Sequence, residues 1–161
     1  MEVCELLDKG LIDFDGQDIR RLSTRQWVTV RERSLSILFQ DLRIFPELTS
    51  MENVLLKNRL TGHKTKEEIN TLFETMGIAD KTDEKAGKLS FGQQQRVAFI
   101  RSLCQPFDFI LLDEPVSHLD DANGAVMSRL LEEEARRQGA GILVTSIGKH
   151  LKLDYDTILK L

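Results

Sequence analysis

Short apolar runs alternate with amphipathic stretches along the chain, and this alternation limits the fold more than any other feature of the sequence. The runs at 107–112 (FDFILL) and 141–145 (GILVT) have the length of strands and are nearly continuously apolar, as in parallel sheets buried on both faces. Between them, residues 121–138 carry apolar side chains at helical spacing and end before Gly139, which predicts a crossover helix. The sequence therefore predicts an α/β domain with a mostly parallel sheet.

Other segments fit the same fold class. We expect short strands at 11–14, 34–39 and 157–161, the first running into a turn at Asp15-Gly16. Thr65 and Glu68 have the spacing of a capping box, so a helix should begin there and end at Gly77. On the exposed side of the 121–138 helix, we expect ion pairs four residues apart, namely Glu132 with Arg136 and Glu133 with Arg137.

Composition excludes several function classes. The chain has 161 residues, 22 basic and 26 acidic, for a net charge of −4, which gives no reason to expect binding to nucleic acid. No apolar run approaches the roughly 20 residues that span a bilayer, and the acidic start does not suit a signal peptide, so we expect a cytoplasmic location. Cys4 and Cys104 are far apart in sequence, which favours reduced structural thiols over a disulfide framework or a zinc site.

Two polar segments flank the 107–112 run. In the first, Ser90 and Gln93 predict a capped helix whose free N–H groups and hydroxyl suit a phosphate group. In the second, Asp113 and Glu114 follow a buried strand, where an Asp can hold Mg²⁺ through water and an adjacent carboxylate can deprotonate an attacking water. Each segment alone is also explained without function, as a capped helix and as a charged strand end.

Taken in order, these segments resemble the motifs of ATP-binding-cassette (ABC) ATPases. The resemblance extends from about residue 11 to the C-terminus. The matching segments are 39–54 (FQDLRIFPELTSMENV) for the Q-loop and the stretch after it, 89–97 (LSFGQQQRV) for the signature, 110–115 (ILLDEP) for Walker B and 117–120 (SHLD) for the D-loop. Four motifs in the correct order make chance agreement very improbable.

The resemblance implies a P-loop NTPase-like fold, an ABC ATPase core with a mostly parallel sheet flanked by helices. A helical subdomain carrying the signature is expected at about 41–104, and the sheet core at 1–40 and 105–161, so that 1–161 forms a single partial domain. The implied cofactors are ATP and Mg²⁺. The implied partners are a second ABC ATPase subunit, in a homo- or heterodimer, and transmembrane transporter subunits that hold the chain on the inner face of the cell membrane.

The resemblance also implies roles for individual residues. Asp113 and Gln40 would hold the metal, and Glu114 would be the catalytic base. Gln40 would also sense the γ-phosphate and link it to a membrane partner docking near 43–53.

The signature and the D-loop are expected to act across a dimer. Ser90, Gly92 and Gln93 would bind nucleotide held by the second subunit, and Asp120 would contact that subunit. Considered separately, Gln40 is also explained as a polar strand end and Asp120 as a helix N-cap.

Three departures from the family pattern change these expectations. No GxxxxGK[ST] loop occurs, so we expect a chain truncated before Met1, without Walker A and inactive in isolation. Ser146 occupies the position of the family's switch histidine, while His150 is nearby but out of register. Phe91 stands where the signature usually has glycine.

Three functions remain open at this point. The first is an ATPase component of an ABC transporter. The second is a catalytically impaired ABC-like chain, a regulatory or signature-donating subunit or the product of a disrupted gene, which the missing loop favours. The third, a DNA-repair or chromosome-type ABC ATPase, lacks the coiled-coil heptads that it requires.

Overall fold

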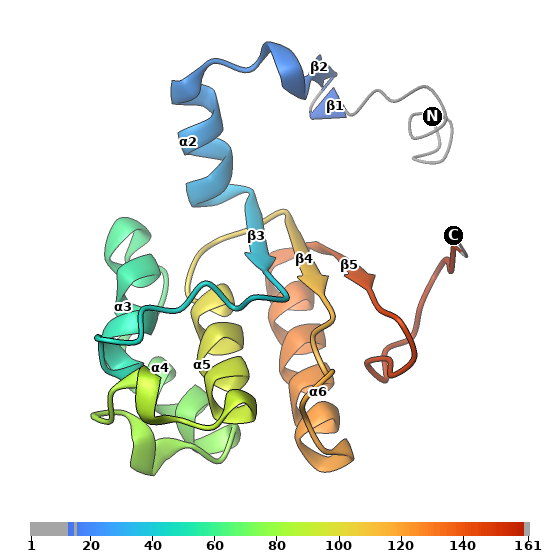
Figure 1. Ribbon diagram of the computed structural model, residues 1–161. Coiled ribbons are helices and arrows are strands. Elements are labelled where there is room, and N and C mark those ends of the chain that lie inside the picture. The colour runs from blue at the N-terminus through green and yellow to red at the C-terminus, as the bar shows by residue number, and fades with distance from the viewer. Residues whose placement is uncertain (1–12, 15, 160–161) are drawn as a thin grey trace.

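Three parallel strands form the centre of the computed structural model, which describes residues 13–14 and 16–159 (Figure 1). They are β3 (Leu35–Leu38), β4 (Phe109–Asp113) and β5 (Gly141–Thr145), hydrogen-bonded in the order β3-β4-β5. Leu38 lies opposite Leu112, and Asp113 lies opposite Thr145. The carboxyl ends of the strands therefore meet at one edge, and the predicted α/β fold with a parallel sheet is confirmed.

Helices make up most of the remaining chain. They are α2 (Thr24–Arg33), α3 (Ser50–Thr61), α4 (Lys66–Thr75), α5 (Phe91–Leu103) and α6 (Asp121–Gln138), with short 3-10 turns at Ile19–Arg21, Ala79–Lys81 and Ala86–Lys88. The two helices predicted after Thr65 and at 121–138 are confirmed. None of the helices in the described ranges combines the length and the apolar character needed to cross a bilayer.

A two-stranded hairpin precedes α2. It pairs β1 (Asp13–Phe14) with β2 (Gln17–Asp18) in antiparallel fashion, and Gly16 lies in the turn at φ 74°. The strand predicted at 11–14 is thus confirmed for Asp13–Phe14, while residues 11, 12 and 15 lie outside the described part. Figure 1 shows this hairpin and α2 beyond the amino end of β3.

Local sequence determines where the helices begin. Four of them start with a complete capping box, in which the hydroxyl accepts the N–H of the third helical residue and that residue's side chain accepts the cap's own N–H. The four capping residues are Ser23, Thr49, Thr65 and Ser90. The boxes at Thr65 and Ser90 were predicted, and the one at Thr49 carries the same Thr-x-x-Glu signal.

One face of the sheet packs in the main core. The core includes Leu38, Ile110 and Leu112 from the strands, together with buried residues of α5 and α6 such as Phe99 and Leu131. The expectation that both faces of β4 are buried is wrong. Phe109 is 45% exposed and Leu143 on β5 is 48% exposed, because the helices in the described ranges pack on one face only.

Two further expectations are corrected. Residues 157–159 do not form a strand, and 160–161 lie outside the described part. The i,i+4 ion pairs expected on α6 are replaced: Arg137 binds Glu134 and Glu68, and Arg129 faces Glu133. The physical reason is that Glu134 lies in the protein interior and attracts the nearby guanidinium more strongly than an exposed carboxylate does.

Cys104 is a buried free thiol. Burial raises the pKa of this thiol to about 12, so it stays protonated and unreactive at neutral pH. The expectation of a structural thiol therefore fits Cys104, while Cys4 lies outside the described residues.

A buried carboxylate joins α6 to the loop between α3 and α4. Glu134 accepts hydrogen bonds from Lys64 Nζ at 2.9 Å, Arg137 Nη2 at 2.8 Å and Gln138 Nε2 at 2.6 Å, and His63 Nε2 lies 3.2 Å away. Burial alone raises the pKa of Glu134, but the bonds from Arg137 and Lys64 outweigh it and lower the pKa to about 2. This carboxylate is therefore ionised in the folded protein at neutral pH.

Glu134→Gln should destabilise the fold at neutral pH by about 3 kcal/mol, because it leaves the buried Lys64 ammonium without its counter-charge. A depressed carboxyl pKa contributes stability above the unfolded value near 4.5, and that contribution is lost as the pH falls toward 2. Urea unfolding measured at pH 7 and at pH 3 should therefore show that the free energies of unfolding of variant and wild type differ less at pH 3 than at pH 7. Glu133→Gln, in which the replaced side chain is 63% exposed, is the matched control and should change stability by less than about 0.5 kcal/mol. An equal difference in the free energy of unfolding at both pH values would contradict a stabilising role for the ionised Glu134 carboxylate.

Candidate functional site

The strand carboxyl ends and the amino ends of α5 and α6 face the same end of the molecule. Figure 1 shows that α5 and α6 begin at the end of the molecule toward which β3, β4 and β5 point. The strand ends facing this way carry Gln40 after β3, Asp113 and Glu114 at β4 and Ser146 after β5, and the helix starts carry Ser90 on α5 and Asp120 on α6. Ligands of open parallel sheets bind at the carboxyl ends of the strands, so this is the natural place for a site.

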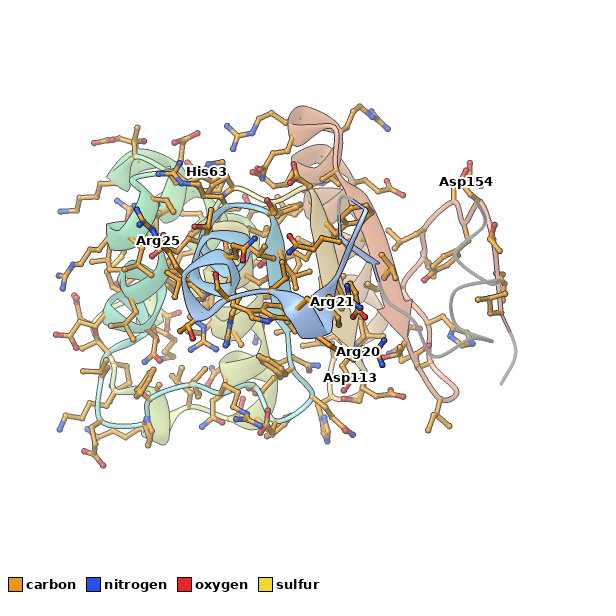
Figure 2. All side chains as sticks on the ribbon, turned by 90° about the horizontal axis from the view of Figure 1, so that it is seen from above. Arg20, Arg21, Arg25, His63, Asp113 and Asp154 are labelled. Carbon is orange, nitrogen blue, oxygen red and sulfur yellow. The ribbon has the colours of Figure 1, made fainter. Side chains whose placement is uncertain are left out.

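Asp113 is the last residue of β4 and is exposed. Its Oδ1 accepts a hydrogen bond of 2.6 Å from Thr145 Oγ1, the residue opposite it on β5. Figure 2 labels Asp113 at the rim of the sheet, well away from His63 in the helical part. Thr145 therefore orients one oxygen of a carboxylate that solvent can reach.

Glu114 lies in a backbone conformation that side chains rarely adopt. Its φ is 49°, in the left-handed region, which costs a residue other than glycine on the order of 1 kcal/mol. The N–H of Glu114 donates to Thr145 O at 3.0 Å, and the carboxylate accepts the N–H of Ile147. The last residue of β5 and a residue just after that strand thus bind the two carboxyl groups at the end of β4.

The amino end of α5 has the geometry of an anion receptor. Ser90 is exposed, and its hydroxyl accepts Gln93 N at 3.3 Å, while Gln93 Oε1 accepts Ser90 N at 2.9 Å. The helix dipole and the first-turn N–H groups favour a negative group at this position. Each of these side chains accepts the backbone N–H of the other residue, so a ligand would compete with the capping box.

The segment after β4 packs against the first turn of α5. A Cβ at Gly92 would lie 3.0 Å from His118 O, so the close approach of the two backbones requires glycine. Phe91 stacks on His118 with ring centroids 4.3 Å apart. The phenylalanine that departs from the family signature therefore contacts the predicted D-loop.

Asp120 is the N-cap of α6. Its Oδ1 accepts Asn123 N and its Oδ2 accepts Asn123 Nδ2, both at 2.8 Å. The backbone N–H bond of Asn123, followed by the side-chain bond, lowers the pKa of Asp120. Lys149, which follows β5, donates to Leu119 O at 2.6 Å and so fixes the neighbouring backbone.

Ser146 and His150 lie together although their sequence positions differ by four. The chain turns at Gly148, whose φ is 96°, and Ser146 Oγ lies 2.5 Å from His150 Nδ1. His150 was predicted to be out of register with the switch position. In the structure its imidazole contacts the hydroxyl that occupies that position.

Magnesium fits the chemistry of this edge. The described residues contain no cluster of three His, Cys, Asp or Glu side chains able to hold a metal. Mg²⁺ binds through one or two carboxylates together with phosphate and water oxygens, so it does not need such a cluster. Asp113 is exposed and oriented by Thr145, which is consistent with a residue that holds a phosphate-bound ion.

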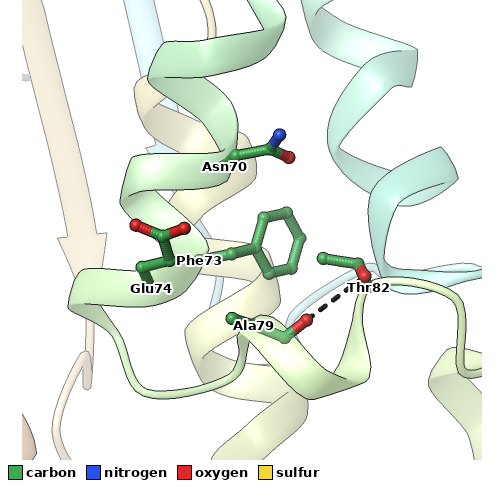
Figure 3. Close-up of a pocket in the computed structure, with 5 residues that line it drawn as sticks. All are labelled: Asn70, Phe73, Glu74, Ala79 and Thr82. Carbon is green, nitrogen blue, oxygen red and sulfur yellow. Dashed lines mark hydrogen bonds between the residues drawn. The ribbon is translucent and has the colours of Figure 1, made fainter.

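Two hollows in the surface lie away from these residues. One, of about 240 Å³, is lined by Asn70, Phe73, Glu74, Ala79 and Thr82, with Thr82 Oγ1 donating to Ala79 O at 3.2 Å (Figure 3). A second, of about 400 Å³, lies between α4 and α6 and includes Glu134. Neither is lined by a residue of the sheet edge, so we do not assign a site to either.

Some residues that shape this edge were missed in the sequence. Thr145 and Lys149 gave no signal, because only the pairing of β5 with β4 brings them to the carboxylates and the D-loop. Gln95 is buried and donates to the backbone of the Glu114 turn. Its position in the run QQQ gave no means of separating it from Gln93 and Gln94.

Comparisons with known proteins agree on one family. The sequence model described as "ABC transporter" matches residues 3–117. The chain is 36% identical to the phosphate import ATP-binding protein PstB 2 of Natronomonas pharaonis, over 89% of this chain and 54% of that protein. It is 32% identical to the lipoprotein-releasing system ATP-binding protein LolD of Porphyromonas gingivalis, over 94% of this chain and 71% of that protein.

Solved structures give the same result. A dimeric structure of MJ0796, a bacterial ABC transporter cassette, superposes with a TM-score of 0.70 at 27% identity, covering 82% of this chain and 60% of that one. A dimeric post-hydrolysis state of the MJ0796 cassette, bound to ADP and Pi, gives a TM-score of 0.67. The chain spans about half the length of PstB 2 and somewhat under two thirds of MJ0796.

Proposed function

Because the chain belongs to the ABC transporter family of ATP-binding domains, we propose that it couples ATP binding and hydrolysis to membrane transport as one member of a dimer. The observation that carries the proposal is the presence in one chain of an exposed Ser90 at the amino end of α5 and of the Asp113-Glu114 pair at the carboxyl end of β4. A helix amino end suits a phosphate, and paired carboxylates suit a metal and an attacking water.

In this proposal the residues at the strand ends and helix starts have different roles. Asp113 and Gln40 hold Mg²⁺, which supplies charge neutralisation for the phosphates. Glu114 accepts the proton of the attacking water. Ser90, Gly92 and Gln93 bind nucleotide held by the second subunit, since they lie exposed or half-buried at the amino end of α5.

Asp120 and Ser146 complete the proposed site. Asp120, as part of the D-loop, contacts the second subunit. Ser146, together with His150, occupies the place from which a side chain meets the γ-phosphate, and the hydroxyl–imidazole contact supplies a polar group there.

The phosphate-binding loop of the family, Walker A, is not part of residues 1–161. No GxxxxGK[ST] sequence is present, so a complete nucleotide site needs such a loop from outside this segment. This observation also favours a second candidate function, in which the chain is catalytically impaired and only donates its signature to a complete partner or regulates it.

Partners and location follow from the same proposal. MJ0796 forms a dimer, and LolD belongs to a lipoprotein-releasing system. We propose that this chain pairs with a second ABC ATPase subunit and docks through 43–53 on transmembrane subunits, at the cytoplasmic face of the membrane. Phe45 is 54% exposed in that segment and offers an apolar contact.

The isolated chain 1–161 should bind MgATP only with a Kd above about 1 mM, because the backbone cradle for the phosphates is missing. Titration calorimetry with MgATP measures this, and the complete LolD cassette of P. gingivalis titrated in parallel is the positive control. The complex purified through a tag on this chain should hydrolyse MgATP. Micromolar affinity of the isolated chain would contradict the need for an outside loop, and a complex without ATPase activity would contradict the proposed function.

A further inference from the structure

Gln95 is buried beneath the Glu114 turn. It lies on α5, five residues after Ser90, and is 2% exposed. Its Nε2 donates to Pro115 O at 2.7 Å and to Glu114 O at 3.3 Å. One amide therefore binds two successive carbonyl groups of the chain that follows β4.

The other half of the same amide is unsatisfied. Gln95 Oε1 is buried and has no hydrogen-bond partner among the described residues. A buried polar atom without a partner costs about 1 to 3 kcal/mol, so a purely packing role would be served better by an apolar side chain. The donor half of the amide is thus what the position requires.

The turn that Gln95 binds is the strained one. Glu114 has φ 49°, and its carbonyl also accepts Ser117 Oγ at 3.2 Å and Ser117 N at 3.4 Å. A strained backbone persists when surrounding bonds over-determine it. Among the donors to the Glu114 carbonyl, Gln95 comes from a different element, since Ser117 lies in the turn itself. Thr145 O on β5 accepts the Glu114 N–H.

Gln95 also lies on the helix that begins with the signature. Gly92 lies against His118 O, so α5 and the 114–119 segment are in contact at two levels, the Gly92 backbone and the Gln95 side chain. The Glu114 turn is therefore joined directly to the helix that begins with the signature.

We infer that Gln95 is a positioning residue that holds the strained Glu114 turn, and with it the Glu114 carboxylate, to the signature helix. The inference deepens the proposed function and rests on it for its catalytic consequence. Its geometric part stands on the two carbonyl bonds and the positive φ alone.

Gln95→Met tests the inference, since methionine has a similar length and is apolar but cannot donate. Gln94→Met is the matched control: Gln94 Nε2 also donates to two carbonyl groups, Ala86 O at 3.0 Å and Leu89 O at 3.2 Å, away from Glu114. Both variants are made in the complex purified through a tag on this chain. Gln95→Leu serves as a second variant in case methionine prevents folding.

Two measurements are taken on each complex. Hydrogen exchange by mass spectrometry should show faster exchange of peptides covering 114–117 and 147 in Gln95→Met and not in Gln94→Met. Steady-state MgATP turnover should show kcat lower by about 10- to 100-fold in Gln95→Met with KM within about threefold, because the carboxylate is misplaced while nucleotide contacts remain.

The outcomes separate the two proposals. Faster exchange confined to the Glu114 turn supports the positioning role even if the complex has no ATPase activity, in which case the proposed function fails alone. Unchanged exchange at 114–117, equal effects of Gln94→Met and Gln95→Met, or an unchanged kcat in an active complex would each overturn the inference.

Discussion

Ser90→Arg should lower MgATP turnover of the complex by at least about 100-fold. The hydroxyl and the first N–H groups of α5 are the donors that we propose for the phosphates held by the second subunit, and removing one such donor typically costs 10²- to 10³-fold in rate. Arginine also fills the exposed position beside Gly92 and so blocks close approach of the nucleotide. Turnover is measured on the complex purified through a tag on this chain.

The control for Ser90→Arg must remove a helix cap as well, because losing the Ser90 cap costs about 1 kcal/mol of stability by itself. Thr65→Arg does this on α4, where Thr65 and Glu68 form the same capping box as Ser90 and Gln93. Both variants should lose similar thermal stability, and only Ser90→Arg should lose turnover. Equal turnover in wild type and Ser90→Arg would show that the proposed action across the dimer is wrong.

Local patterns predicted the elements where short-range rules decide the structure. The predicted bounds of α6 agree with the structure because the signals that set them, namely the Asp120 cap, the apolar spacing and Gly139, all belong to one helix. The predicted α5 capping box was confirmed because its two bonds join residues only three positions apart, Ser90 and Gln93.

Long-range contacts decided what the sequence could not predict. Burial of both faces of β4 was inferred from the apolar run, but burial depends on which helices cover the sheet, and Phe109 stayed 45% exposed. The prediction of ion pairs on α6 was wrong because Glu134, and not Glu133, lies next to the buried Lys64 ammonium. Neither fact is local in the sequence.

In the candidate site, too, some features follow from local sequence and others from long-range contacts. The order of Asp113, Glu114 and Ser90 indicated the family, whereas their setting depends on pairing between distant segments. Thr145 reaches Asp113 because β5 pairs with β4. Spacing alone placed His150 out of register with Ser146, and the turn at Gly148 brings the two side chains together.

Glu114→Gln should lower MgATP turnover of the complex by at least about 100-fold, because an amide cannot accept the proton of the attacking water and general base catalysis typically contributes 10²- to 10⁴-fold. The amide keeps an oxygen for the N–H of Ile147, so the turn should keep its shape. ATP binding to the complex should change little, and filter binding of labelled ATP beside the turnover assay measures both. Glu133→Gln, in an exposed part of α6, is the matched control.

Glu114→Gln and Ser90→Arg together separate the two candidate functions. If the complex hydrolyses ATP at a site that contains Glu114, both variants lose turnover. If the chain only donates its signature to a complete partner, Ser90→Arg loses turnover and Glu114→Gln keeps it, because Glu114 then faces no phosphate. Loss in both variants therefore requires a phosphate-binding loop beside Glu114, supplied from outside residues 1–161. Loss in Ser90→Arg alone assigns the chain to the impaired, signature-donating class.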